Sequence, residues 1–147
     1  MLTIAVPAAI TCLLGVRWYE SRPIQWQPYS TSLFNSRCKD GNPAIVFFSA
    51  DWDVDSKIVE TITFADPRVT MLLRRNSVTP IMVDCTTQAP IVTEAYTLHG
   101  VNTTPYVFIY FPDALDSPTL LRGVTMPEQL IAAVDRDYDR RHPDTGG

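Results

Sequence analysis

The sequence predicts an α/β domain built around a mixed sheet, with an apolar segment at the N-terminus. From Ser30 onward, helical and strand patterns alternate in the order helix, strand, helix, helix, strand, helix, strand, strand, helix. Because helices join the early strands, these strands are expected to be parallel, whereas the last two can form an antiparallel hairpin. The length of 147 residues allows one such domain and an appendage.

Apolar runs mark the strands. Residues 44–48 (Ala-Ile-Val-Phe-Phe) contain no polar side chain, which is typical of a strand buried on both faces. The strongest strand pattern is Tyr-Val-Phe-Ile-Tyr-Phe at residues 106–111. The other two strands are expected over residues 79–84 and 119–123.

Capping residues and helix breakers mark the helices. Ser30 can cap the first helix, and Asp66 followed by Pro67 is typical of an N-cap and a first helical position. Gly100 suits the end of a later helix, where His99 is expected to interact with the helix dipole. Besides the helix that starts at Asp66, helices are expected over residues 30–39, 51–64, 89–98 and 125–138.

The N-terminal segment is interpreted as a membrane anchor. Residues 1–16 carry no charged side chain, and Trp18 and Tyr19 follow soon after. A single-pass helix needs roughly 17–25 apolar residues, and Trp and Tyr are enriched at the membrane interface. Residues 1–19 are therefore expected to contact lipid. A cleaved signal peptide and a buried core helix are the alternatives. A signal peptide has a basic residue before its apolar run, and this sequence has none there.

The rest of the chain divides into three parts. Residues 20–29 are polar, contain two prolines and are predicted to be an extended linker. Residues 30–139 form the predicted domain, and residues 140–147 are predicted to be a charged C-terminal tail. Arg17, directly after the apolar run, weakly favours a cytoplasmic position for the domain.

Composition and spacing exclude several classes of function. The net charge of −4 and the lack of Lys/Arg runs argue against nucleic-acid binding. Cys12, Cys38 and Cys85 form no C-x-x-C pair, and with two histidines in the chain no zinc site is expected. The alternating aspartates of residues 51–55 lack the later Gly and Glu of a calcium loop. We therefore expect no metal site and no cofactor.

Three segments resemble the thioredoxin-like superfamily, and within it the C-terminal domain of transmembrane thiol-disulfide interchange proteins. They are Val-Phe-Phe-Ser-Ala-Asp-Trp at residues 46–52, Thr-Phe-Ala-Asp-Pro-Arg-Val at 63–69 and Val-Asn-Thr-Thr-Pro-Tyr-Val at 101–107. The resemblance covers about residues 30–138 and implies a thioredoxin fold, in which helices flank a central mixed sheet. It also implies a cis peptide before Pro105, a peptide-binding surface at Trp52, Thr104 and Pro105, and an extracytoplasmic domain.

The chain departs from this family at its reactive groups. Counted from Trp52, the two cysteines of the family correspond to Asp53 and Ser56, and Phe47 stands where the family often has a buried acid. Disulfide exchange needs an attacking thiolate and a second thiol. We therefore interpret Asp53 and Ser56 as a degenerate active site without catalytic residues, in which Asp53 caps the following helix.

These observations lead to one main hypothesis and two alternatives. The main hypothesis is a membrane-anchored, redox-inactive module that binds protein partners as a subunit of a larger membrane assembly, and is not an enzyme. One alternative is a thiol-disulfide oxidoreductase that uses Cys38, Cys85 or the cysteines of a partner. The other is a chaperone-like peptide holder, whose peptide binding is expected to depend on Pro105.

Overall fold

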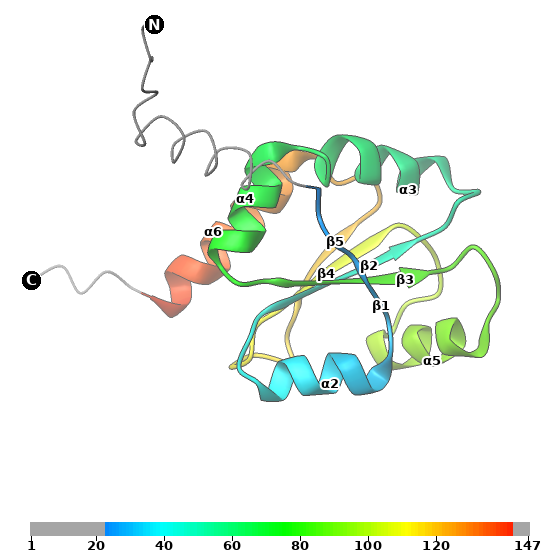
Figure 1. Cartoon of the computed structure of the whole chain (residues 1–147), viewed down its shortest axis with the longest axis horizontal. Helices are drawn as coiled ribbons and strands as arrows, with labels where there is room; N and C mark the ends of the chain where they lie inside the picture. The colour runs from blue at the N-terminus through cyan, green and yellow to red at the C-terminus, as the bar shows by residue number, and fades with distance from the viewer. Residues whose placement is uncertain (1–22, 143–147) are drawn as a thin grey trace, which may run out of the picture.

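The computed structural model describes residues 23–142, which form a five-stranded sheet between two layers of helices (Figure 1). The strands are β1 (Gln27–Pro28), β2 (Ala44–Ser49), β3 (Thr79–Asp84), β4 (Tyr106–Tyr110) and β5 (Thr119–Arg122). The helices are α2 (Thr31–Lys39), α3 (Val54–Ile58), α4 (Pro67–Arg75), α5 (Pro90–His99) and α6 (Pro127–Arg141), and a π-helical segment, η1 (Val59–Thr63), continues α3.

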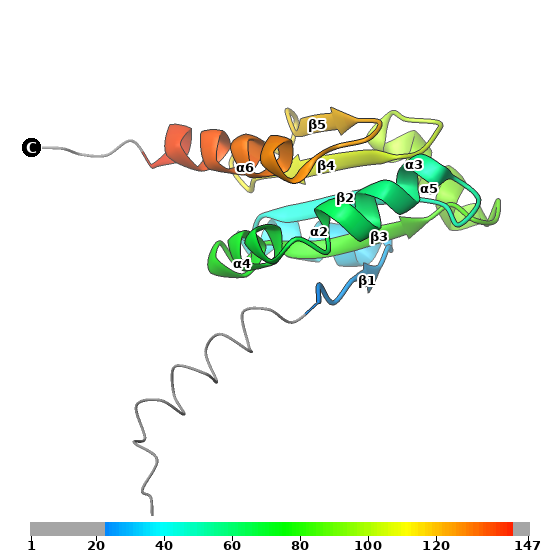
Figure 2. The same ribbon diagram turned by 90° about the horizontal axis from the view of Figure 1, so that it is seen from above.

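The sheet has the order β1-β3-β2-β4-β5 and mixed strand directions. β2 is parallel to β3 and antiparallel to β4, and β4 and β5 form an antiparallel pair. The predicted parallel unit and C-terminal hairpin are therefore confirmed. Helices α2 and α5 cover one face of the sheet, and α3, α4 and α6 cover the other (Figure 1). Figure 2 shows α6 on the β5 side of its layer and α4 on the β1 side.

The central strand β2 contributes to both hydrophobic cores. Ile45 and Phe47 pack with α4 and α6, whereas Val46 and Phe48 pack with α2 and α5. All four side chains are fully buried. Alternate side chains of a strand point to opposite faces, so a strand between two helical layers must be apolar throughout. The predicted burial of this strand on both faces is confirmed.

The linker predicted for residues 20–29 is wrong where the structure describes it. Gln27 and Pro28 form β1, which pairs in parallel with β3 at the edge of the sheet. Trp26, just before β1, packs its ring 5.6 Å from that of Phe47 and 4.7 Å from that of Phe64, measured between ring centroids. A two-residue strand has no detectable alternation of apolar and polar residues, which explains why the sequence pattern missed it.

The predicted helix caps are largely confirmed. The side chains of Ser30 and Asp66 accept hydrogen bonds from the backbone amides of Leu33 and Arg68, and Gly100 ends α5 with a left-handed φ of 69°. The helix predicted over residues 51–64 begins three residues later, at Val54, and its second half is the π-helical segment η1.

The C-terminal tail predicted from residue 140 begins too early. Helix α6 continues to Arg141, whose guanidinium lies 4.1 Å from the ring centroid of Phe111. Its Nε donates a hydrogen bond to Asp113 Oδ1 at 2.6 Å. These contacts hold the last turn of α6 against the end of β4. The rest of the predicted tail, residues 143–147, lies outside the described residues.

The predicted membrane anchor, residues 1–19, also lies outside the described residues. Within residues 23–142, none of the helices has both the length and the apolar character needed to span a bilayer.

His99 is a buried neutral residue rather than a partner of the helix dipole. Its Nδ1 lies 2.6 Å from the hydroxyl of Tyr110, and its Nε2 lies 3.3 Å from the hydroxyl of Tyr29. The rings of Phe34, Phe48 and Phe108 surround it. Burial disfavours the charged imidazolium and lowers the pKa of His99 to about 4.

This burial predicts a pH dependence of stability. The unfolded state takes up a proton near pH 6.5, whereas the folded state resists protonation of His99 down to about pH 4. The free energy of unfolding is therefore expected to fall by up to about 3 kcal/mol as the pH drops from 6.5 to 4, since one pKa unit corresponds to about 1.4 kcal/mol. Urea denaturation at a series of pH values measures this fall.

The variant His99→Gln serves as the matched control. Glutamine keeps polar groups next to Tyr29 and Tyr110 but does not titrate. In this variant the free energy of unfolding is expected to be independent of pH between 6.5 and 4.5, even where the variant is less stable than the wild type. An unchanged slope would assign the pH dependence to other groups.

Candidate functional site

The candidate site lies where α3 begins, beyond the carboxyl end of β2 (Figure 1). The chain leaves β2 at Ser49 and turns through residues 50–52 to Asp53, the N-cap of α3. The turn is closed by a hydrogen bond from the amide of Asp53 to the carbonyl of Ala50, at 3.1 Å. A polar side chain at Asp53 therefore faces the unpaired amides of the first helical turn.

The carboxylate of Asp53 joins three parts of the site. Its Oδ2 accepts hydrogen bonds from Ser56 Oγ at 2.6 Å and from Thr104 Oγ1 at 2.7 Å, and its Oδ1 accepts one from the amide of Asp55 at 3.2 Å. The predicted cap by Asp53 is confirmed. The side chain of Ser56 is fully buried, and its Oγ also accepts a hydrogen bond from the amide of Ala50 at 3.3 Å.

Pro105 directly follows Thr104, whose hydroxyl donates to this carboxylate. The peptide bond between Thr104 and Pro105 is cis, as the resemblance implied. Pro105 is buried, and its carbonyl accepts a hydrogen bond from the amide of Gly123 at 3.0 Å. Thr104 therefore reaches Asp53 from the start of β4, so the structure brings together Asp53, Ser56 and the Thr104–Pro105 peptide.

Two large apolar side chains beside Asp53 are exposed. Trp52 exposes 67% of its surface and Val54 exposes 72%. Val54 lies in the first turn of α3 and points away from the core. Neighbouring exposed apolar side chains are typical of interaction surfaces. Trp52, Asp53, Val54, Ser56, Thr104 and Pro105 are called the Asp53 site below.

Asp53 carries a negative charge at neutral pH. Burial raises the pKa of its carboxyl, but the hydrogen bonds from Ser56, Thr104 and the amides of Asp55 and Ser56 outweigh burial and lower the pKa below its ordinary value. A carboxylate also interacts favourably with the positive end of a helix. The site is thus a stable anion held by hydroxyl and amide donors.

The variant Asp53→Ala is expected to lose about 1–2 kcal/mol of stability, because it removes an N-cap and leaves the buried hydroxyl of Ser56 without its acceptor. The lowered pKa means that the contribution of Asp53 is present above its unfolded value of 3.8 and is lost as the pH falls through the folded pKa. The difference between wild type and variant in urea denaturation is therefore expected to shrink below pH 4. The variant Asp53→Asn keeps a side chain that can cap the helix, and it is expected to lose less stability than Asp53→Ala.

A second polar cluster joins the turn after β2 to α3 and η1, and it was not anticipated from the sequence. Lys57 Nζ donates hydrogen bonds to Asp51 Oδ1 at 2.6 Å and to Glu60 Oε2 at 3.0 Å, and Glu60 accepts another from Ser49. The hydrogen bonds to Asp51 and Glu60 raise the pKa of Lys57. Lys57 is therefore charged and unsuited to act as a base or nucleophile. The three-residue spacing of Lys57 and Glu60 was the available sequence signal.

The two described cysteines are not part of the Asp53 site, although the amide of Cys85 donates a hydrogen bond to the carbonyl of Ser49 at 2.7 Å. Cys38 is in the last turn of α2, and Cys85 follows β3; neither forms a disulfide. Burial raises the pKa of both thiols. A reactive thiolate needs a lowered pKa, as at a helix N-terminus or beside a cation. Neither cysteine has these surroundings.

The aspartates around the site do not converge on a common point. Asp51 binds Lys57, whereas Asp53 binds Ser56 and Thr104. Within residues 23–142 no group of three or more His, Cys, Asp or Glu side chains is arranged to hold a metal ion.

The strand order, the helix that starts after β2 and the cis-proline before β4 define a thioredoxin-like fold. Solved structures with the same fold include the C-terminal domain of DsbD from Neisseria meningitidis in its oxidised form, with a TM-score of 0.62 and 19% identity over 76% of this chain and 98% of that domain. A thioredoxin from Thermus thermophilus has a TM-score of 0.64 and 17% identity over 84% of this chain and 95% of its own.

A third similar structure is a thioredoxin from Trypanosoma brucei brucei, with a TM-score of 0.59 and 18% identity over 82% of this chain and 96% of its own. The predicted fold is thus confirmed. No family model matches the sequence, and no curated protein matches it. At these identities the structural likeness establishes the fold, and function must be argued from the site.

Proposed function

We propose that this chain is a redox-inactive thioredoxin-like module, anchored in a membrane by residues 1–19, that binds a partner protein through the Asp53 site as a subunit of a larger assembly. The observation that carries this proposal is the carboxylate of Asp53, which is hydrogen-bonded to both Ser56 and Thr104. It occupies the helix terminus at which this fold can activate a thiol.

The chemistry of the site supports the absence of redox activity. The DsbD domain is described in an oxidised and a reduced form. A carboxylate and a hydroxyl at the start of α3 cannot interconvert in this way, since disulfide exchange needs two thiols. Phe47, fully buried in β2, supplies no proton-transferring acid. Asp53 is also already satisfied by its hydrogen bonds, which favours a structural role.

The surface of the site supports protein binding. Trp52 and Val54 present exposed apolar area on a rigid helix start, and Asp53 ties this start to the Thr104–Pro105 peptide. Tryptophan is enriched among the residues that dominate binding energy at interfaces. The family resemblance implies that an extended segment binds beside Pro105. Residues 1–19 support the anchor by their apolar sequence, and the resemblance favours an extracytoplasmic domain.

The test is extraction of the tagged full chain from its native membranes in a mild detergent. The wild-type chain is expected to elute with a stoichiometric partner, and the double variant Trp52→Ala/Val54→Ser without it. Leu115→Ser is the matched control, because Leu115 is an exposed apolar residue in the turn between β4 and β5. A chain that elutes alone and monomeric would contradict the assembly, and equal recovery with both variants would contradict the site.

The second candidate is a thiol-disulfide oxidoreductase that uses Cys38, Cys85 or a partner's cysteines. It is favoured by the many thioredoxins among the structures with this fold. Reductase activity of the purified full chain, abolished by Cys38→Ser or Cys85→Ser, would support it. Partner binding that survives both substitutions, without reductase activity, supports the redox-inactive module.

A further inference from the structure

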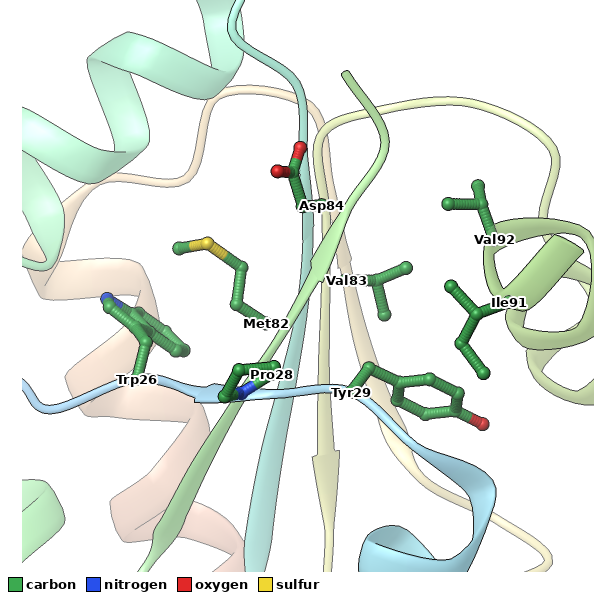
Figure 3. A pocket seen from close by; sticks show the side chains of 8 residues that line it. All are labelled: Trp26, Pro28, Tyr29, Met82, Val83, Asp84, Ile91 and Val92. Atoms are coloured by element: carbon green, nitrogen blue, oxygen red, sulfur yellow. The ribbon is translucent and has the colours of Figure 1, made fainter. Parts of the chain in front are cut away.

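An apolar groove lies at the β1 edge of the sheet, away from Thr104 and Pro105. The strand order places β3 and β2 between this edge and β4. The groove has a volume of about 360 Å³, and it is formed by the chain around β1, the end of β3 and the first turn of α5 (Figure 3). Its lining residues are Trp26, Pro28, Tyr29, Met82, Val83, Asp84, Ile91 and Val92.

The groove exists because β1 is shorter than its neighbour. β1 pairs with β3 only as far as Met82, and the chain then turns through Tyr29 into α2. β3 continues for two more residues, Val83 and Asp84, without a β1 partner. At this end of the edge Val83 and Val92 are buried, whereas Ile91 in the first turn of α5 exposes 37% of its surface.

Binding in this groove must rely mainly on side chains. Pro28 has no amide hydrogen, and a proline on an edge strand hinders the pairing of another strand. The amide of Tyr29 is already bonded to the carbonyl of Met82 at 2.9 Å. A ligand therefore gains little from extending the sheet and must instead fit the apolar walls.

Asp84 provides a negative charge at the rim of these walls. It is exposed, and its Oδ1 accepts a hydrogen bond from the amide of Thr86 at 2.9 Å. The side chain and amide of Thr86, with the charge of Lys57, hold the pKa of Asp84 below its ordinary value. Lys57 itself is bonded to Asp51 and Glu60. No lysine or arginine is among the lining residues that the structure describes.

The lining residues divide into two sets around the edge. Figure 3 shows Trp26, Met82 and Asp84 on one side of β3, and Tyr29, Val83, Ile91 and Val92 on the other. Met82 and Asp84 share a face because alternate residues of a strand point the same way. One side thus offers an apolar path that ends at a carboxylate, and the other side is apolar.

We propose that this groove binds a segment of a partner protein that presents a basic side chain between apolar ones. The aliphatic stem of a lysine or arginine lies along Trp26 and Met82, and its charged group meets Asp84. A neighbouring apolar side chain contacts Ile91, the exposed residue of α5 in the groove. Long basic side chains commonly bury their stems on apolar surface while the charged group stays at its edge. Complementarity to Asp84 selects this class of partner.

The experiment uses the full chain in a mild detergent, with its methyl groups labelled for NMR. The probe is the synthetic peptide acetyl-Gly-Val-Lys-Val-Gly-amide, compared with the same peptide carrying Glu in place of Lys. The Lys peptide is expected to shift the methyl signals of Met82 and Ile91, and the Glu peptide is not. Asp84→Asn is expected to weaken binding of the Lys peptide by up to about fivefold, the upper end of what an exposed ion pair contributes.

The control Asp116→Asn removes an exposed carboxylate outside the groove and is expected to leave binding unchanged. Equal binding of the two peptides, no loss with Asp84→Asn, or shifts confined to other residues would overturn the proposal. Shifts of Met82 and Ile91 that depend on protein concentration without peptide would identify a second copy as the occupant and also overturn it. Trp52→Ala is expected not to affect the Lys peptide, so this groove and the Asp53 site can fail independently.

Discussion

The double variant Asp53→Cys/Ser56→Cys is expected to form a disulfide and to reduce insulin, unlike the wild-type chain. The two positions are already close enough for side-chain contact, with Asp53 Oδ2 and Ser56 Oγ 2.6 Å apart. Position 53 is the N-cap of α3, where the helix dipole stabilises a thiolate. The fold therefore has a place for a redox pair at these two positions, which Asp53 and Ser56 occupy in this chain.

The measurement is insulin reduction in the presence of dithiothreitol, together with titration of free thiols. We expect at least about a tenfold gain over wild type, since disulfide exchange needs a low-pKa thiolate and a second thiol. The single variant Ser56→Cys is the control, because it lacks the thiol at the helix N-cap. Wild-type activity equal to that of the double variant would contradict a redox-inactive module. A double variant that forms no disulfide would contradict the geometry of the site.

The variant Phe47→Asp, which places an acid where the family often has one, is expected to unfold the domain. Phe47 is fully buried in β2, and its ring packs 4.9 Å from that of Phe64, measured between centroids. Loss of a buried phenylalanine costs about 3–5 kcal/mol, and a carboxylate in the apolar core adds to this loss. The total free energy of unfolding of a domain of this size is about 5–15 kcal/mol.

Circular dichroism during urea denaturation measures the effect of Phe47→Asp. The control is Phe47→Leu, which keeps an apolar side chain and is expected to cost about 1–2 kcal/mol. A variant Phe47→Asp with the wild-type midpoint would show that this position tolerates a charge. Trp26, Phe47 and Phe64 pack against one another, so position 47 is expected not to accept a buried acid in this chain.

The candidate site could be predicted in its chemistry but not in its contacts. The residue types at positions 53 and 56 and the absence of a C-x-x-C pair are visible in the sequence. The cap by Asp53 also follows from local preference, since aspartate is favoured before a helix. The hydrogen bond between Asp53 and Thr104 joins residues 51 positions apart. Such a contact depends on how β4 packs beside β2, which no local pattern describes.

Two errors in the sequence interpretation have the same origin. Residues 27 and 28 form a strand because β3 offers an edge and Trp26 finds a place against Phe47 and Phe64. His99 is neutral because the helix end that carries it is covered by Tyr29, Tyr110 and neighbouring rings. In both cases the surrounding structure overrode what composition and helix position predicted locally.

The sequence by itself determined the main helices and strands from Ser30 onward, their order, and the presence of Asp53 and Ser56 rather than two cysteines at the start of α3. Apolar runs, helix caps and the identity of Asp53 and Ser56 are local properties, and local preferences act along the chain. Only the tertiary structure decided that Asp53 binds Ser56 and Thr104 together, that β1 completes the sheet edge, and that Asp84 borders an apolar groove. These features depend on burial and on contacts between distant segments, which arise when the two helical layers pack against the sheet.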